Sequence, residues 1–154
     1  MSLQNDKANN RLNSFMLSKL FQGEIIEQVD SPYNGKIQVI KKLGQYKIVA
    51  DDLLQSGSII ADLWKKPLKK VSSIKYSVSS ILVLGLGGGT VAQLCAKKWP
   101  EANMIGVEID TEMIRLGKKY LGMDKIAKLE IVEADAFEWM DTHTETFDLI
   151  LVDM

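Results

Sequence analysis

The stretch that most constrains the fold is residues 81–91, ILVLGLGGGTV, where four apolar residues lead into a turn with glycine at four of its five positions. An apolar strand that passes through glycines into a helix is typical of the first βα unit of a doubly wound parallel sheet. Glycine permits φ > 0 and lets a ligand approach the main chain, while the helix amino terminus offers unpaired N–H groups. Such a turn can also serve only close helix–strand packing, so the motif alone leaves both roles open.

The sequence after Ser80 predicts strands and helices in alternation. Strands are expected at about 81–84, 103–109, 128–133 and 147–153, and helices at about 89–99, 111–121 and 136–141. The strand cores are apolar throughout, as expected where helices cover both faces of a sheet. Because strand–helix–strand connections are right-handed, we predict an α/β fold with a Rossmann-like doubly wound parallel sheet in residues 81–154, in the order 3-2-1-4.

The first half of the chain has a different pattern. Apolar residues alternate with polar ones in residues 24–57, which predicts a small antiparallel β domain. Residues 1–23 are expected to form a tail with a short helix around Leu12–Leu20. Residues 58–80 are expected to form a helix that Pro67 ends, followed by a solvated, lysine-rich linker.

Composition excludes several classes of protein. The 19 basic and 20 acidic residues give a net charge of -1, so no nucleic-acid or anionic membrane partner is expected. No apolar run reaches the roughly 20 residues of a membrane span. The single cysteine, Cys95, can form neither an internal disulfide nor a thiolate metal cluster, so we expect no metal and a cytoplasmic location.

Three acidic residues follow predicted strands of the parallel sheet. The second strand ends in VEID with Glu108, the third in EADAF with Asp135, and the fourth in FDLILVDM with Asp153. Because parallel strands end at one edge of their sheet, we expect these acids beside the glycine turn. There Glu108 can accept hydrogen bonds from ribose hydroxyls and Asp135 from an adenine amino group. The pattern fits an adenosine with a cationic group attached, such as S-adenosylmethionine.

These motifs also carry a family resemblance. ILVLGLGGGTV, VEID, EADAF and FDLILVDM resemble the cofactor motifs of class I S-adenosylmethionine-dependent methyltransferases. Upstream, GEIIEQVDSPYNGKIQV and GQYKIVADDLLQSG resemble the amino-terminal β domain and domain junction of the spermidine synthase family. The resemblance covers about residues 23–153 and implies binding of S-adenosylmethionine or its decarboxylated form. It implies a donor site of Gln55, Gly85, Gly87, Glu108, Asp135 and Ala136, with Asp153 as the catalytic residue facing the acceptor.

The chain departs from the polyamine-forming members at two places. They carry an aspartate in the glycine turn, where this chain has Gly88, and a tyrosine after the glutamine, which SGSIIADLW lacks. Such an aspartate pairs with the amine of the decarboxylated donor and repels a donor that keeps its carboxylate. We therefore favour methyl transfer to a small nucleophile, such as an amine, over aminopropyl transfer. A polyamine aminopropyltransferase and a non-catalytic nucleoside-binding module are the alternatives.

Other residues have ordinary structural explanations. Asp110 can touch the ribose or cap the helix that opens at Thr111, and the sequence does not separate the two. His143 is expected in a solvated loop and Cys95 as a small buried hydrophobe. Packing roles are expected for the three tryptophans, Trp64, Trp99 and Trp139.

The apolar fourth strand, LILV, is expected to form an open sheet edge. Relatives with this fold continue past this strand, whereas this chain ends one residue after Asp153. We expect either a fragment of a longer protein or a homodimer that covers the edge, with an acceptor pocket that one chain leaves incomplete.

Overall fold

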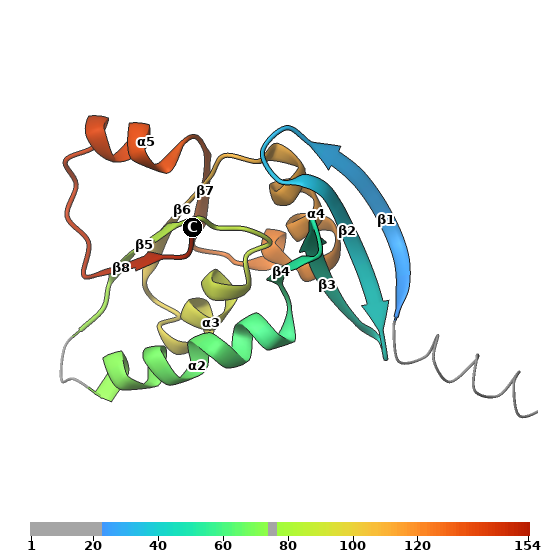
Figure 1. Ribbon diagram of the computed structural model, residues 1–154. Helices are drawn as coiled ribbons and strands as arrows, with labels where there is room; N and C mark the ends of the chain where they lie inside the picture. Colours follow the sequence, from blue (N-terminus) through green and yellow to red (C-terminus); the bar gives the residue numbers. More distant parts are fainter. Residues whose placement is uncertain (1–22, 74–76) are drawn as a thin grey trace, which may run out of the picture.

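The computed structural model describes residues 23–73 and 77–154, so the helix predicted around Leu12–Leu20 lies outside the described residues. The second half of the chain forms the predicted parallel sheet (Figure 1). Its strands are β5 (Ser80–Leu84), β6 (Asn103–Glu108), β7 (Leu129–Glu133) and β8 (Leu149–Val152). They are all parallel in the order β7-β6-β5-β8, which confirms the predicted order 3-2-1-4.

Helices cover both faces of this sheet because alternate side chains of each strand point to opposite sides. One face packs Ile81 and Val83 against α3 (Thr90–Lys98) and α2 (Ser58–Ser73). The other packs Leu82 and Leu84 against Trp139 of α5 (Ala136–Thr142). Figure 1 shows α2 and α3 below the sheet and α5 above it.

The prediction that Pro67 ends its helix is wrong. Helix α2 continues through Pro67 to Ser73, so half of the expected linker is helical. Proline leaves the carbonyl four residues earlier, that of Leu63, without its helical N–H partner. Leu63 is 66% exposed, so water can satisfy this carbonyl, while Leu68 is 3% exposed and anchors the second half of α2 in the core. Lys65, Lys66, Lys69 and Lys70, the lysines of this segment among the described residues, are exposed, as expected.

The first half of the described chain is an antiparallel sheet in the order β1-β2-β3-β4. Its strands are β1 (Glu24–Ser31), β2 (Gly35–Lys42), β3 (Gln45–Ala50) and β4 (Leu53–Ser56). The sequence pattern did not predict β4, because the turn before it contains no glycine. Asp51 and Asp52 adopt φ values of 43° and 65°, and two successive positive φ values define the type I′ turn of a tight hairpin.

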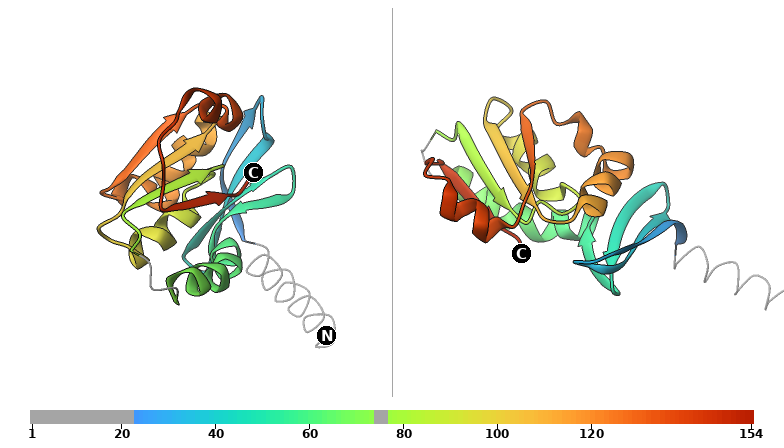
Figure 2. Two further views of the ribbon diagram at one scale, coloured as in Figure 1. Left: turned by 90° about the vertical axis from the view of Figure 1, so that its left-hand side faces the viewer. Right: turned by 90° about the horizontal axis from the view of Figure 1, so that it is seen from above.

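Helix α4 (Thr111–Leu121) joins the two sheets, which form separate layers in Figure 2. Ile37 and Ile48 of the antiparallel sheet are fully buried against Met113 and Leu116 of α4. Each such side chain contributes about 1.5–3 kcal/mol of burial free energy, so this apolar contact helps to hold the two halves together. Ile114, on another side of α4, belongs to the core of the parallel sheet.

Glu27 of β1 makes a polar contact with the same helix. Its carboxylate accepts hydrogen bonds from Lys119 Nζ at 2.7 Å and Tyr120 Oη at 2.6 Å, and pairs with Arg115 Nη2 at 2.7 Å. These three partners lower the pKa of Glu27 to about 2, with Lys119 contributing most. The apolar packing and this charged cluster together hold the antiparallel sheet against α4.

Candidate functional site

A cavity of about 440 Å³ opens at the carboxyl ends of the four parallel strands. The antiparallel sheet supplies its opposite wall through the β1–β2 turn and β4. All the predicted site residues except Asp110 line it, and the lining includes Tyr33, Asn34, Gln55, Gly85, Gly87, Glu108, Asp135, Ala136, Phe137 and Asp153. The expected convergence of strand-end acids and the glycine turn is therefore present in the structure.

Glu108 lies at the end of β6 and is 8% exposed. Its Oε2 accepts a hydrogen bond from the Gly87 amide at 2.7 Å, and its Oε1 accepts one from the Asp110 amide at 3.0 Å. Burial raises the pKa of Glu108 above its usual value, while these backbone donors act in the opposite direction. A half-satisfied buried carboxylate beside a cavity can accept further hydrogen bonds from a ligand's hydroxyl groups.

The glycine turn serves both the cavity and packing. Gly85 and Gly87 line the cavity, and the Gly87 amide is held by Glu108. Gly88 instead faces the junction of the two sheets, where its amide donates to Ser56 Oγ at 2.8 Å. A Cβ on Gly88 would lie within 3 Å of Leu121, Ser56 and Ile48. An aspartate could not replace Gly88 without displacing these neighbours.

Asp110 stabilises the fold by binding the start of α4 and the β1–β2 turn. It is 1% exposed and caps α4, with Oδ1 accepting from the amides of Glu112 at 3.0 Å and Met113 at 3.3 Å. Its other oxygen accepts from Ser31 and Asn34 of the β1–β2 turn. Because four donors occupy the carboxylate and it does not line the cavity, we assign Asp110 to the helix cap and leave it out of the proposed donor site.

Asp135 and Ala136 lie where β7 passes into α5. Asp135 Oδ1 caps α5 by accepting from the amides of Phe137 at 2.8 Å and Glu138 at 3.2 Å. Its Oδ2 accepts no hydrogen bond from residues 23–73 or 77–154, so that oxygen can accept one from a ligand. Phe137, two residues later, is 65% exposed and also lines the cavity. This edge can therefore offer an acceptor and an aromatic surface to a planar base.

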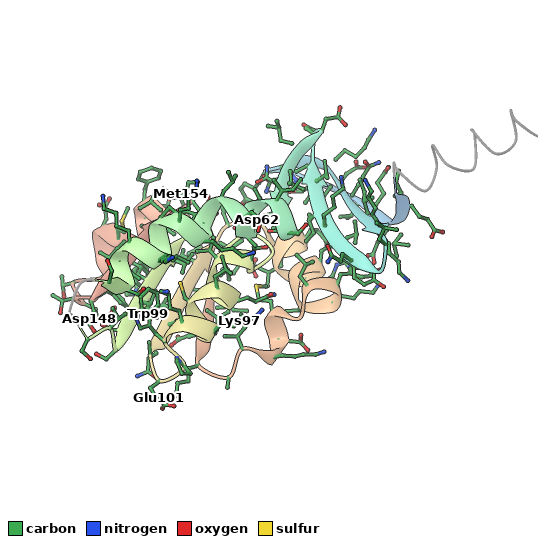
Figure 3. The ribbon with its side chains drawn as sticks, turned by 90° about the horizontal axis from the view of Figure 1, so that it is seen from below. Asp62, Lys97, Trp99, Glu101, Asp148 and Met154 are labelled. Carbon is green, nitrogen blue, oxygen red and sulfur yellow. The ribbon has the colours of Figure 1, made fainter. Side chains whose placement is uncertain are left out.

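Asp153 follows β8 at the cavity rim. Its amide donates to the Leu84 carbonyl at 2.9 Å, which continues the β5–β8 pairing. Desolvation raises the pKa of its carboxyl above the usual value, while a hydrogen bond from the Trp64 side chain lowers it. Asp148, at the other end of β8, is tied to Ser79 and Ser80, and Figure 3 shows it far from Met154. Of these two acids, only Asp153 lines the cavity.

Of the cavity residues that the antiparallel sheet contributes, sequence reasoning predicted Gln55 but missed Tyr33, Asn34 and Ser56. Tyr33 and Asn34 line the cavity from the β1–β2 turn, which the sequence marks only as a turn. Ser56 is buried and holds the Gly88 amide. The available signal was position, because Ser56 directly follows Gln55 in the junction segment.

The remaining candidates lie elsewhere. Cys95 is fully buried in α3, and burial raises the pKa of its thiol to about 12, so it is a core residue as predicted. His143 ends α5 with its ring stacked on Trp139 at 4.1 Å, outside the cavity lining. Trp139 is buried, and Trp64 and Trp99 pack on the core, as predicted. In the view of Figure 3, Trp99 lies away from Met154.

Comparison with known proteins shows which fold this arrangement of strands and helices belongs to. Residues 81–154 match the family model described as a methyltransferase domain. The chain superposes on a probable spermidine synthase from Corynebacterium glutamicum with a TM-score of 0.69 and 18% identity, over 85% of this chain and 52% of that one. The chain has the spermidine synthase-like class I methyltransferase fold.

Curated relatives of this fold carry two kinds of activity in their names. The chain is 28% identical to polyamine aminopropyltransferase 2 from Aquifex aeolicus, over 94% of this chain and 30% of that protein. It is 26% identical to a malonyl-[acyl-carrier protein] O-methyltransferase from Paenibacillus, over 70% of this chain and 38% of that protein. The chain thus spans less than half the length of these relatives, and they do not separate methyl from aminopropyl transfer.

The described part of the chain has two further properties. Within residues 23–73 and 77–154, no helix combines the length and the apolar character needed to cross a bilayer. The same residues contain no group of three or more His, Cys, Asp and Glu side chains that could hold a metal ion.

Proposed function

We propose that the cavity binds S-adenosylmethionine, or its decarboxylated form, and that the protein transfers a methyl or aminopropyl group to a small nucleophile, with methyl transfer favoured. The observation that carries this proposal is the buried Glu108 carboxylate, held by the Gly87 amide at the end of β6 and open to a cavity of about 440 Å³. That volume is within the usual range of small-molecule sites.

The donor site would be assembled from both walls of the cavity. Glu108 would accept hydrogen bonds from the ribose hydroxyls, and Asp135 from the adenine amino group, with Ala136 beside it. Gly85 and Gly87 would let the donor approach the main chain. Gln55, half-buried at the end of β4, would contact the donor from the antiparallel sheet.

The bound donor supplies a sulfonium whose attached carbon is open to nucleophilic attack. The chain's own task would be to align the acceptor for in-line displacement and to take its proton. Asp153 is placed for the second task, because it lines the cavity and desolvation raises the pKa of its carboxyl. A carboxylate with a raised pKa is a better proton acceptor for an amine that loses its proton during attack.

The nature of the donor decides between the two transfer reactions. Gly88 supplies no carboxylate and does not line the cavity, so nothing at this position favours the decarboxylated donor. We expect S-adenosylmethionine to bind at least as tightly as its decarboxylated form in side-by-side calorimetric titrations. A strong preference for the decarboxylated donor would favour the alternative, a polyamine aminopropyltransferase, which agrees with the name of the Aquifex relative.

The third candidate, a non-catalytic nucleoside-binding module, predicts donor binding without consumption. A donor-consumption assay with a panel of small amines separates it from both transferases. Binding with no turnover for any acceptor would favour this module.

We also propose that two chains associate through β8. Among the described strands β8 pairs only with β5, and Ile150 and Val152 are 53% and 57% exposed on it. An apolar open edge favours pairing with another strand, most simply across a two-fold axis.

Light scattering should therefore report a dimer for the wild type and a monomer for Ile150→Lys, because an edge lysine opposes pairing. Leu43→Lys, on the exposed β2–β3 turn, should remain dimeric. A monomeric wild type would refute the association.

A further inference from the structure

The turn between β1 and β2 is fastened to a single carboxylate oxygen. Ser31 Oγ donates to Asp110 Oδ2 at 2.5 Å, and Asn34 Nδ2 donates to the same oxygen at 2.6 Å. Asp110 is 1% exposed and Ser31 8% exposed, so this contact is shielded from water. Hydrogen bonds to a buried, charged acceptor are among the stronger contacts in proteins.

The turn itself is stiffened by the same serine. Ser31 Oγ accepts hydrogen bonds from the amides of Tyr33 at 3.0 Å and Asn34 at 3.2 Å. Fixing Ser31 on Asp110 therefore also fixes the backbone of the next three residues. Tyr33 and Asn34 both line the cavity, and Tyr33 is 58% exposed.

Asp110 also contacts Glu108, which lies on the wall of the cavity formed by the parallel strands. Its Oδ1 caps α4, and its amide donates to Glu108 Oε1 at 3.0 Å. Glu108 in turn holds the Gly87 amide at 2.7 Å. One residue thus connects the β1–β2 turn on one wall with Glu108 and the glycine turn on the other.

We propose that Asp110 is a positioning residue that couples ligand binding to docking of the β1–β2 turn, so that Tyr33 forms a ligand-contacting wall only while Ser31 and Asn34 are bound to Asp110 Oδ2. This inference rests on the proposed function, because the ligand is the same nucleoside donor. Asp110 acts through the turn and through Glu108, without touching the donor. Tyr33 is the contact residue that this arrangement adds to the site.

Asp110→Asn tests the proposal because the two oxygens have separate tasks. Asparagine caps helices as well as aspartate does, so its oxygen can keep the α4 amides. Its NH₂ group then faces Ser31 and Asn34 and cannot accept their hydrogen bonds. In calorimetric titration with S-adenosylmethionine, we expect Asp110→Asn to weaken binding by about tenfold, within the usual range of coupling between sites.

Two further variants separate a specific effect of this contact from a general loosening of the fold. Ser31→Ala removes the turn's contact without altering the α4 cap and should weaken binding to a similar degree. Glu27→Gln weakens the other polar contact between β1 and α4, away from the cavity lining, and should leave affinity within about twofold of wild type, since it shares no partner with the site. Equal losses in Glu27→Gln would show a general loosening of the two sheets and overturn the specific role of Asp110.

A double-mutant cycle with Tyr33→Ala shows whether Asp110 acts through the turn. If it does, Asp110→Asn should weaken binding far less in the Tyr33→Ala background than in the wild type, because the wall is already lost. If the double variant loses affinity by the product of the two single fold-losses, the two residues act independently and the coupling is overturned. Unchanged affinity in Asp110→Asn would overturn it as well, and either result would leave the donor site intact. A wild type that binds no S-adenosylmethionine, decarboxylated donor or adenosine would instead refute the proposed function, and the coupling with it.

Discussion

Gly85→Ala should lower the free energy of unfolding by about 2–5 kcal/mol, through backbone strain and overpacking acting together. Gly85 adopts φ of 78°, a conformation that L side chains rarely accept. An added Cβ would also lie within 3 Å of the carbonyl carbon of Asp153 and closer still to its oxygen. Relief would require the end of β8 to move away from β5, which would break the bond from the Asp153 amide to the Leu84 carbonyl.

Gly44→Ala is the matched control for this substitution. Gly44 has the same φ of 78°, but nothing lies within 4 Å of its added Cβ. Its loss should be limited to backbone strain, about 1–2 kcal/mol. Urea unfolding of both variants measures the difference between their losses in unfolding free energy. That difference is the cost of bringing an added Cβ close to the end of β8. Equal losses would show that the two segments separate easily and that the turn does not fix the position of Asp153.

The parallel sheet could be predicted because its information is local. Apolar strand cores, the glycine turn and helices of suitable length constrain the connections to right-handed crossovers, which leave few possible strand orders. The same reasoning predicted that Glu108, Asp135 and Asp153 share one edge, since parallel strands end together. The cavity lining agrees for all three residues.

The errors arose where a local rule was overridden. Pro67 was expected to end its helix, but burial of Leu68 holds the next turn in the core. Strand β4 was missed because Asp51 and Asp52 form a tight turn that glycine or asparagine more often forms. In both places tertiary packing stabilises a conformation that intrinsic preference disfavours.

The wall formed by Tyr33 and Asn34 could not be predicted from periodicity. Its position depends on α4 packing against the antiparallel sheet and on the contact between Ser31 and Asp110, residues 79 positions apart. Such a contact leaves no repeating pattern in the sequence. The sequence could offer only two roles for Asp110, and the structure adds a third, the anchor of the β1–β2 turn.

Glu108→Gln is expected to weaken S-adenosylmethionine binding by about 10-fold to 100-fold, or about 1–3 kcal/mol, the cost of losing a charged hydrogen-bond acceptor. Glutamine keeps the size of the side chain but replaces one acceptor oxygen with a donor. That donor would face either the Gly87 amide or the Asp110 amide, both of which need an acceptor. Calorimetric titration of the folded variant measures the effect directly.

Glu133→Gln is the matched control. Glu133 is the register partner of Glu108 on the neighbouring strand β7, but it is exposed and does not line the cavity. Its substitution should leave the affinity within about twofold of the wild type, because it is separated from the ligand. A comparable loss in both variants would indicate a general effect of charge at this edge and remove the specific role of Glu108.

The pH dependence of binding gives a second test of the same carboxylate. Burial raises the pKa of Glu108 above 4.5, so its ionised form is complete only at a higher pH than for an exposed glutamate. If the ionised form accepts the ribose hydroxyls, wild-type affinity should be greatest above the raised pKa and fall as the pH drops through it. The part of this fall that belongs to Glu108 should be absent from Glu108→Gln, whereas Glu133→Gln should follow the wild type. Parallel profiles for wild type and Glu108→Gln would show that Glu108 titrates without touching the ligand, and the ribose contact would then have to be assigned elsewhere in the cavity.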